Sequence, residues 1–181
     1  GQLINGSDVI YLITPDRFAN GKPGNDTTDD TIEKANRKDE DSRHGGDIQG
    51  ILDHFDYIKK LGVTTLWLNP FLENDQPKYS YHGYGISDFY KTDSRFGTNE
   101  DFKKLVAQCH ANGMKMIMDQ VFNHCGAGHW WMKDLPAKNW LNQWPKFTRS
   151  NFTNIAASDP YASPSDYRLL DRKSTRLNSS H

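Results

Sequence analysis

Three side chains that could bind a sugar or a metal follow one short apolar segment: Asp119, Asn123 and His124. The segment before them, residues 115 to 118, has the apolar character of a short buried strand. A carboxylate, an amide and an imidazole can all exchange hydrogen bonds with hydroxyl groups. The same residue types also cap the turn that follows a strand. The pattern alone is therefore consistent with either a binding site or a turn cap.

A second group of candidates is the run Tyr-His-Gly-Tyr-Gly at residues 81 to 85. The aromatic face of Tyr84 could meet the CH face of a neutral sugar ring. Packing within a loop is the alternative for Tyr84, and a hydrogen-bonded core histidine is the alternative for His124.

A third group lies between residues 20 and 47 and offers hard oxygen atoms. Calcium takes about 6 to 8 ligands of this kind. The candidates are the side chains of Asn20, Asn25, Asp26 and Asp47, with the carbonyl groups of Lys22 and Gly45. Asn, Asp and Gly are also ordinary turn-forming residues, so the composition of this loop does not by itself predict a metal site.

The charge balance restricts the class of partner. The chain carries 22 Lys and Arg residues against 23 Asp and Glu residues, a formal net charge of −1. Nucleic acids and anionic membranes attract basic surfaces, so we expect neither as a partner. No apolar run reaches the roughly 20 residues that span a bilayer, and the sequence opens with neither a signal peptide nor a Met. Cys109 and Cys125 have no CxxC spacing and are too few for a disulfide scaffold.

Three strands and two helices are predicted to position the candidate residues. Apolar runs at residues 9–13, 63–68 and 115–118 are typical of buried strands. Helical periodicity begins at Ile48 and stops at Gly62. A second helix is predicted to open with a capping box between Thr98 and Asp101 and to end at Gly113. Residues 20–41 and 70–97 show no period and are predicted to be long loops.

This order of elements predicts an α/β fold with a parallel sheet. A doubly wound sheet normally has a Gly-rich turn directly after its first strand, which this chain lacks. Long polar loops after the strands favour a (β/α)8 TIM barrel, whose site lies at the carboxyl ends of the strands. A complete barrel needs about 250 residues. We therefore expect a partial barrel of three strands and two helices, followed by the start of a domain inserted after strand three.

Several motifs together make the chain resemble the α-amylase superfamily of glycoside hydrolases. They are PDRFANG at residues 15–21, RHGGDI at 43–48, YHGYG at 81–85 and DQVFNH at 119–124. The stretches NHC at 123–125 and WMKDLP at 131–136 are similar to its neopullulanase and cyclomaltodextrinase branch. The resemblance implies a retaining hydrolase of α-1,4 glucans such as maltodextrins, pullulan or cyclodextrins, with α-1,6 linkages as a second candidate.

The resemblance also implies that the chain lacks the reacting groups. Retaining hydrolysis needs one carboxylate as nucleophile and a second as general acid and base, roughly 5 Å apart. In the family these residues lie on the fourth and fifth strands, so no residue here is expected to be catalytic and the chain alone is expected to be inactive. A non-catalytic glucan-binding relative and a transglycosylase of the same superfamily stay open as alternatives.

Individual roles follow from the resemblance. Tyr84 matches the tyrosine under the glucose ring at the cleavage point, and His124 matches the histidine that donates to the primary hydroxyl of that ring. Asp119 matches an aspartate that orients its neighbours. A structural calcium ion is implied at Asn20, Lys22, Asn25, Asp26, Gly45 and Asp47, although Lys22 replaces a commoner small polar residue. Asn123 is expected to be structural.

The expected domains are the partial barrel at residues 1–124, part of the inserted domain at 125–170, and a tail at 171–181 that resembles a translated sequencing adapter. Four tryptophans of the insertion, at positions 130, 131, 140 and 144, could form its core or a platform for a glucan. The resemblance to the family favours a periplasmic or secreted bacterial protein. The oligomeric state is left open.

Overall fold

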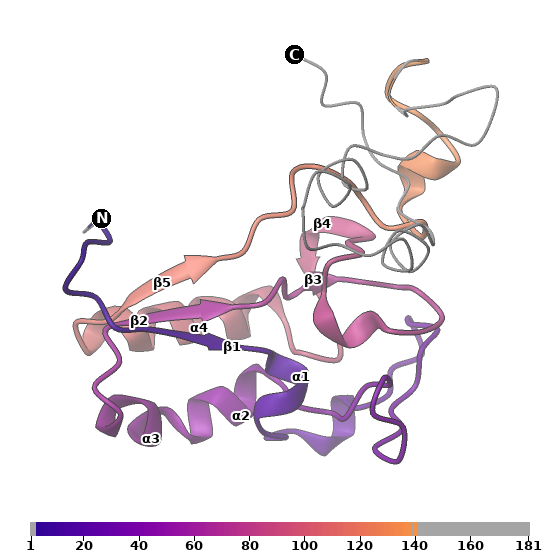
Figure 1. Cartoon of the computed structure of the whole chain (residues 1–181). Coiled ribbons are helices and arrows are strands. Elements are labelled where there is room, and N and C mark those ends of the chain that lie inside the picture. Colours follow the sequence, from indigo (N-terminus) through magenta and orange to yellow (C-terminus); the bar gives the residue numbers. More distant parts are fainter. Residues whose placement is uncertain (1–2, 139, 141–181) are drawn as a thin grey trace, which may run out of the picture.

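The computed structural model describes residues 3–138 and 140 of the chain. Its centre is a parallel sheet of three strands in the order β1-β2-β5. The strands are β1 (Ile10–Ile13), β2 (Thr65–Leu68) and β5 (Lys115–Met118). Leu12 pairs with Trp67, which pairs with Ile117. Figure 1 shows the three strands side by side, with their carboxyl ends pointing toward the same group of loops. The predicted parallel α/β arrangement is confirmed.

The helices between the strands differ in one respect from the prediction. The segment after Asp47 forms two short helices, α2 (Ile48–Asp53) and α3 (Phe55–Lys60), where a single helix was predicted. His54 leaves the helical conformation at φ −104° and ψ 17°. Its ring Nδ1 lies 2.9 Å from the carbonyl oxygen of Gly50. The backbone N–H of His54 donates to the same carbonyl at 3.3 Å, so both groups of His54 close the end of α2 where the chain changes direction.

The second main helix matches its prediction. Helix α4 (Asn99–Ala111) begins with a capping box, in which Thr98 and Asp101 each accept from the other's backbone N–H. Such a cap satisfies two N–H groups that would otherwise lack partners. Gly113, at φ +70°, lies between α4 and β5 and adopts a conformation that favours glycine.

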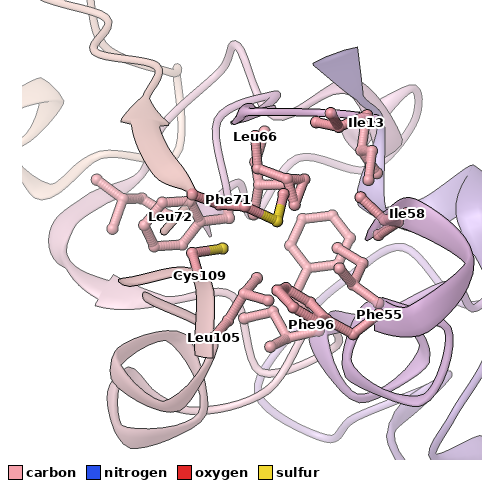
Figure 2. Packing of buried hydrophobic residues seen from close by; sticks show 14 of the residues in the cluster. Ile13, Phe55, Ile58, Leu66, Phe71, Leu72, Phe96, Leu105 and Cys109 are labelled. Carbon is pink, nitrogen blue, oxygen red and sulfur yellow. The ribbon is translucent and has the colours of Figure 1, made fainter. Parts of the chain in front are cut away.

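One apolar core joins the helices to the sheet. Figure 2 shows Ile13 and Leu66 of the strands facing Ile58 of α3 and Leu105 of α4. Burial of such side chains is the main favourable term in folding. On the other face of the sheet, Ile10 and Leu12 are 46% and 49% exposed. The helices described here therefore cover one face and leave the other open.

The predicted loops contain short elements of their own. One turn of helix, α1 (Pro15–Phe18), and a 3₁₀ turn (Pro23–Asn25) follow β1. Residues 70–97 were predicted to be an irregular loop, and this was wrong: they include an antiparallel pair of strands, β3 (Leu72–Glu73) and β4 (Asp88–Thr92), and a 3₁₀ turn (Ser80–His82). Strand β3 has only two residues, too few to show an alternation of polar and apolar residues, and the five residues of β4 do not alternate in burial either.

The described part of the insertion is small and aromatic. A 3₁₀ turn (Trp130–Met132) places the ring of Trp131 at 4.3 Å from that of His129 and 5.5 Å from that of Trp140. Trp130 is 58% exposed. Position 144, the rest of the predicted inserted domain and the predicted adapter tail lie outside the described residues. Among the residues that are described, no helix is both long and apolar enough to cross a bilayer.

Candidate functional site

The site begins at Asp119, directly after β5. Its Oδ2 atom accepts a hydrogen bond from the hydroxyl of Tyr84 at 3.1 Å and another from the indole N–H of Trp67 at 3.2 Å. Trp67 belongs to β2, the neighbouring strand, and pairs with Ile117. Because the strands are parallel, their carboxyl ends bring these residues to one edge of the sheet. The carboxylate holds two aromatic side chains from two different segments.

Tyr84 is positioned by the turn before it. Gly83 follows the 3₁₀ turn with φ +84°, and a Cβ atom at this position would collide with the carbonyl oxygen of Pro70. Only glycine accommodates both the backbone conformation and this close approach. The ring of Tyr84 stacks on that of His82, with 5.8 Å between the ring centroids and 28° between the planes. Tyr84 is 39% exposed, so part of it remains accessible.

His82 is held in one tautomer. Its Nδ1 atom accepts a hydrogen bond of 3.0 Å from the backbone N–H of Tyr84, so this nitrogen carries no proton and Nε2 must carry it. Burial lowers the pKa of His82 below its usual value, and the nearby charge of Arg43 acts in the same direction while Glu33 opposes them. The imidazole is therefore a neutral group with a defined donor.

His124, in the segment after β5, also lies next to Tyr84. Its Nε2 atom lies 3.0 Å from the carbonyl oxygen of Tyr84, so Nε2 donates to that oxygen. Nδ1 is then an acceptor, and it is buried without a hydrogen-bond partner among the described residues. The backbone bond from Gly126 N–H to the carbonyl of Ile86, at 2.7 Å, fixes the segment next to Tyr84. The resemblance implies that His124 donates to a sugar hydroxyl, whereas here its Nε2 atom faces the carbonyl of Tyr84 and its Nδ1 atom is buried.

The electrostatics of this cluster suit a neutral ligand. Burial raises the pKa of Tyr84, and the hydrogen bond to Asp119 and the charge of Asp119 raise it further, so the side chain stays a phenol. Together with His82 and His124, it presents hydrogen-bonding groups and aromatic surface. Such a set can meet both the hydroxyl groups and the CH faces of a sugar. The three residues predicted to bind sugar, Tyr84, Asp119 and His124, thus lie together.

The predicted calcium residues lie in the loop after β1, and Asp47 has a clear local role there. Its Oδ1 atom accepts from the backbone N–H of Gly50 at 2.6 Å and of Gly21 at 3.0 Å, and its Oδ2 atom accepts from that of Lys22 at 2.9 Å. The bond to Gly50 makes Asp47 the N-cap of α2. Asp47 therefore ties the loop to the start of the helix.

The other members of this set leave oxygen atoms without donors. Asn20 donates through Nδ2 to both carboxylate oxygens of Asp26, at 2.7 and 2.9 Å. The Oδ1 atoms of Asn20 and Asn25 are buried, and neither has a hydrogen-bond partner in the part of the chain that the structure describes. A Cβ built on Gly45 would lie 2.7 Å from Cγ of Asp26, so this carboxylate packs directly on the Gly45 backbone. Across the described residues, no three His, Cys, Asp or Glu side chains come together at a metal site, and the oxygens here are mainly amide and backbone atoms.

A match to a protein-family model shows which family this chain belongs to. A model of the alpha amylase catalytic domain matches residues 12–167. The chain belongs to the alpha-amylase family. This match confirms the resemblance found in the sequence motifs and agrees with a fold of the TIM-barrel type.

The relatives of this alpha-amylase domain include members of the predicted branch. It is 37% identical over 147 residues to the cyclomaltodextrinase of Thermoanaerobacter pseudethanolicus, which covers 76% of this chain and 25% of the relative. It is 36% identical over 165 residues to neopullulanase 2 of Thermoactinomyces vulgaris, which covers 84% of this chain and 27% of the relative. The chain thus spans about a quarter of the length of these relatives.

Solved structures agree with the sequence relatives. The alpha-amylase from Anoxybacillus matches with a TM-score of 0.68 and 42% identity, over 82% of this chain and 31% of that one. The cyclic maltosyl-maltose hydrolase from Arthrobacter globiformis, solved in complex with maltose, matches with a TM-score of 0.67 and 32% identity, over 95% of this chain and 38% of that one.

Two residues of the site in this alpha-amylase domain were not predicted individually. His82 lies inside the YHGYG motif, and its place between two motif tyrosines was the available signal. No signal in the sequence indicated Trp67, because an aromatic residue in an apolar strand normally indicates packing. Only the pairing of β2 with β5 brings its indole to Asp119.

Proposed function

We propose that this chain forms one wall of the sugar-binding cleft of a retaining α-glucan hydrolase that acts on maltodextrins, pullulan or cyclodextrins. The observation that carries this proposal is the hydrogen bond between Tyr84 and Asp119. It holds an accessible aromatic ring beside the imidazoles of His82 and His124 at the carboxyl edge of the sheet. The relatives named cyclomaltodextrinase and neopullulanase support this class of substrate.

We further propose that β1, β2 and β5 are the first three strands of a (β/α)8 barrel. The exposed Ile10 and Leu12 support this, because they lie on the sheet face opposite the helices. In a closed barrel that face is the interior and is filled by apolar side chains. Residues 125–170 would then belong to the domain inserted after strand three.

In the proposed mechanism, the residues of this chain bind and orient the substrate. The ring of Tyr84 supports the sugar at the cleavage point, and the phenol is kept in place by Asp119. His82 donates from Nε2, and His124 lies beside the sugar with its imidazole held against the carbonyl of Tyr84. Asp119 already accepts two hydrogen bonds and acts on its neighbours, while the nucleophile and the general acid of a retaining mechanism would come from other strands.

A transglycosylase is the second candidate. The chain is 41% identical over 124 residues to the cyclomaltodextrin glucanotransferase of Bacillus sp. (strain 1-1). The two activities differ in whether water or a sugar hydroxyl attacks the glycosyl-enzyme intermediate. Incubating the complete protein that carries this chain with maltoheptaose and a labelled glucose acceptor separates them. Hydrolysis gives unlabelled products, and transfer gives labelled ones.

Replacing His124 tests the sugar site. In the complete protein, His124→Ala should lower kcat/KM on maltoheptaose by more than tenfold, or about 1.4 kcal/mol of transition-state stabilisation. His110→Ala is the control, because His110 is an exposed residue at the end of α4. Wild-type kcat/KM in a folded His124→Ala protein would remove His124 from the site.

The chain by itself should be inactive. Three strands leave an unpaired sheet edge and an uncovered apolar face, so residues 1–181 expressed alone should melt broadly. No reducing sugar should appear from maltoheptaose or pullulan above a buffer control. Hydrolysis that is lost when a carboxylate of this chain is mutated would contradict both the assignment of roles and the proposed partial barrel.

Finally, we propose that the loop after β1 binds calcium through Asn20, Asn25, Asp26 and Asp47, with the carbonyl groups of Lys22 and Gly45. The fit rests on two buried amide oxygens, from Asn20 and Asn25, that lack donors. Calcium prefers oxygen ligands, and it would neutralise Asp26 while giving both amide oxygens a partner. The ion would serve stability and the order of the loop, with no part in the chemical step.

A further inference from the structure

Arg43 is a buried cation that contacts both acidic side chains and an aromatic ring of the core. Its side chain is 1% exposed. The guanidinium lies 3.8 Å from Asp16 and 3.7 Å from Asp93, and it stacks over the ring of Phe96 at 4.4 Å. Burying a charge costs several kcal/mol unless partners compensate for it. Arg43 therefore occupies an expensive position for which a hydrophobic side chain of similar size would serve packing equally well.

The hydrogen bonds of Arg43 go to the turn that carries the sugar site. Its Nη1 atom donates to the carbonyl oxygen of Ser80 at 3.3 Å and to the hydroxyl of Ser80 at 3.2 Å. Ser80 is fully buried and is the first residue of the 3₁₀ turn that ends at His82. Gly83 and Tyr84 follow directly. A displacement of Ser80 would thus move both rings of the sugar site.

The turn begins in a conformation that needs support. Tyr79, the residue before Ser80, has φ +61° and ψ 28°, a left-handed conformation that costs a residue with a side chain about 1 kcal/mol or more. The carboxylate of Glu33 accepts from the backbone N–H of Tyr79 at 3.2 Å and of Ser80 at 2.7 Å. Glu33 therefore holds the N–H side of the turn, whereas Arg43 and the side-chain amide of Asn74 both donate to the carbonyl of Ser80, each at 3.3 Å. The hydroxyl of Ser80 is contacted by Arg43.

We propose that Arg43 is a positioning residue for glucan binding, which it serves by holding Ser80 so that His82 and Tyr84 present the correct surface to the sugar. This inference rests on the proposed function. Arg43 touches no part of the sugar itself. Asp16 and Asp93 attract the guanidinium from two sides at 3.8 and 3.7 Å, while Nη1 donates to Ser80, so different nitrogens of one planar group face different partners. Lysine offers a single point charge and cannot reach both carboxylates and Ser80 together.

Arg95 provides a matched control within the same ion cluster. It is equally buried, at 1% exposed, and it binds both carboxylate oxygens of Asp93 at 2.8 Å. Its remaining donors go to the backbone carbonyls of Glu33 and Asn74, so among the described residues it makes no direct hydrogen bond to the turn Ser80–His82. Arg43→Lys and Arg95→Lys should both lower the melting temperature, but only the first should change the sugar site.

The test is the affinity of the complete protein for acarbose, measured by titration calorimetry together with kcat and KM on maltoheptaose. Arg43→Lys should weaken acarbose binding at least tenfold and raise KM, whereas Arg95→Lys should change binding less than twofold. Equal binding by the wild type and Arg43→Lys would overturn the inference. A wild-type protein that neither binds acarbose nor cleaves maltoheptaose would instead contradict the proposed function.

Ser80→Ala keeps the test decisive if Arg43→Lys does not fold. It removes only the hydroxyl that Arg43 contacts and should weaken acarbose binding at least threefold with a small change in melting temperature. Ser87→Ala is its control, because the buried hydroxyl of Ser87 bonds to Glu73 and not to Arg43. Wild-type affinity in the folded Ser80→Ala protein would contradict the role of Arg43.

Discussion

The loops after β1 and β2 are both long and polar, but they are held in place by different interactions. In the first loop, residues 19–47, the carboxylates of Asp16 and Asp47 accept from backbone N–H groups at both ends. The amide oxygens of Asn20 and Asn25 are left without donors. In the second loop, residues 69–98, Asp93 is paired with a buried arginine at 2.8 Å.

This difference indicates how each loop reaches its final shape. The second loop is held by ion pairs within the protein, because Arg43 and Arg95 both lie against Asp93. Burial alone would raise the pKa of Asp93, but hydrogen bonds from Arg95 and the charges of both arginines outweigh burial and lower it. The first loop contains acceptors in excess, which a bound cation would satisfy. The loops thus differ in what binds their buried carboxylates, which is backbone N–H groups in the first loop and arginine side chains in the second. Each loop also contains a buried amide oxygen that has no partner among the described residues, and in the second loop it belongs to Asn74.

The largest expected effect comes from removing Asp93 from the ion pairs that hold the second loop. Asp93→Ala leaves two buried guanidinium groups without their shared carboxylate and should destabilise the complete protein by roughly 3 to 5 kcal/mol. The midpoint of urea unfolding measures this. Asp56→Ala is the control, since Asp56 is exposed on α3 and should change stability by less than about 0.5 kcal/mol. A similar small change for Asp93→Ala would show that the ion cluster does not hold the second loop.

The next effect should come from adding calcium to the first loop. At a free calcium concentration about 100 times its dissociation constant, the complete protein should gain about 2.7 kcal/mol. Asp26→Asn should lose this gain with little change in the metal-free protein, because an asparagine can still accept from Asn20. Asp47→Ala should lose it as well and should also cost about 1 kcal/mol without calcium, since the N-cap of α2 is removed.

Melting curves recorded with calcium and with a chelator give both the stability gained on binding calcium and the stability that each variant loses without calcium. Asp93→Ala should keep its calcium-dependent shift, because the change lies in the other loop. If both first-loop variants shift with calcium as the wild type does, the ion binds elsewhere and the contrast between the loops fails.

The smallest effect concerns protonation at the sugar site. His82 has a pKa below 6.5 in the folded protein, first because of burial, whereas the unfolded chain takes up a proton near pH 6.5. Below that pH the unfolded state binds more protons, so stability is lost as the pH falls, with a slope of at most about 1.4 kcal/mol per pH unit.

His82→Asn removes the titrating group but keeps an acceptor for the N–H of Tyr84. Between pH 7 and pH 5, the stability of this variant should fall less steeply than that of the wild type. Parallel curves for the two proteins would mean that His82 already carries its proton in the folded state, against the tautomer that the bond to Tyr84 requires.

Much of the framework is determined by local sequence. The strand Lys115–Met118 and the capping box of Thr98 with Asp101 were both predicted, because apolar runs and cap residues act within a few positions of the chain. The motifs around Tyr84 and Asp119 likewise indicated the family before any contact was known. Residue type and short spacing carry this information directly.

Other features depend on contacts between distant residues. Trp67 and Asp119 are 52 positions apart and meet only because β2 pairs with β5. The bond from Arg43 to Ser80 spans 37 positions, and nothing near either residue predicts it. The break between α2 and α3 depends on a side-chain bond to a carbonyl, which helical periodicity cannot reveal. The sequence alone therefore determined the three strands of the parallel sheet, helix α4 and the family, whereas tertiary packing decided which polar groups are buried together, since burial depends on what the rest of the chain excludes from water.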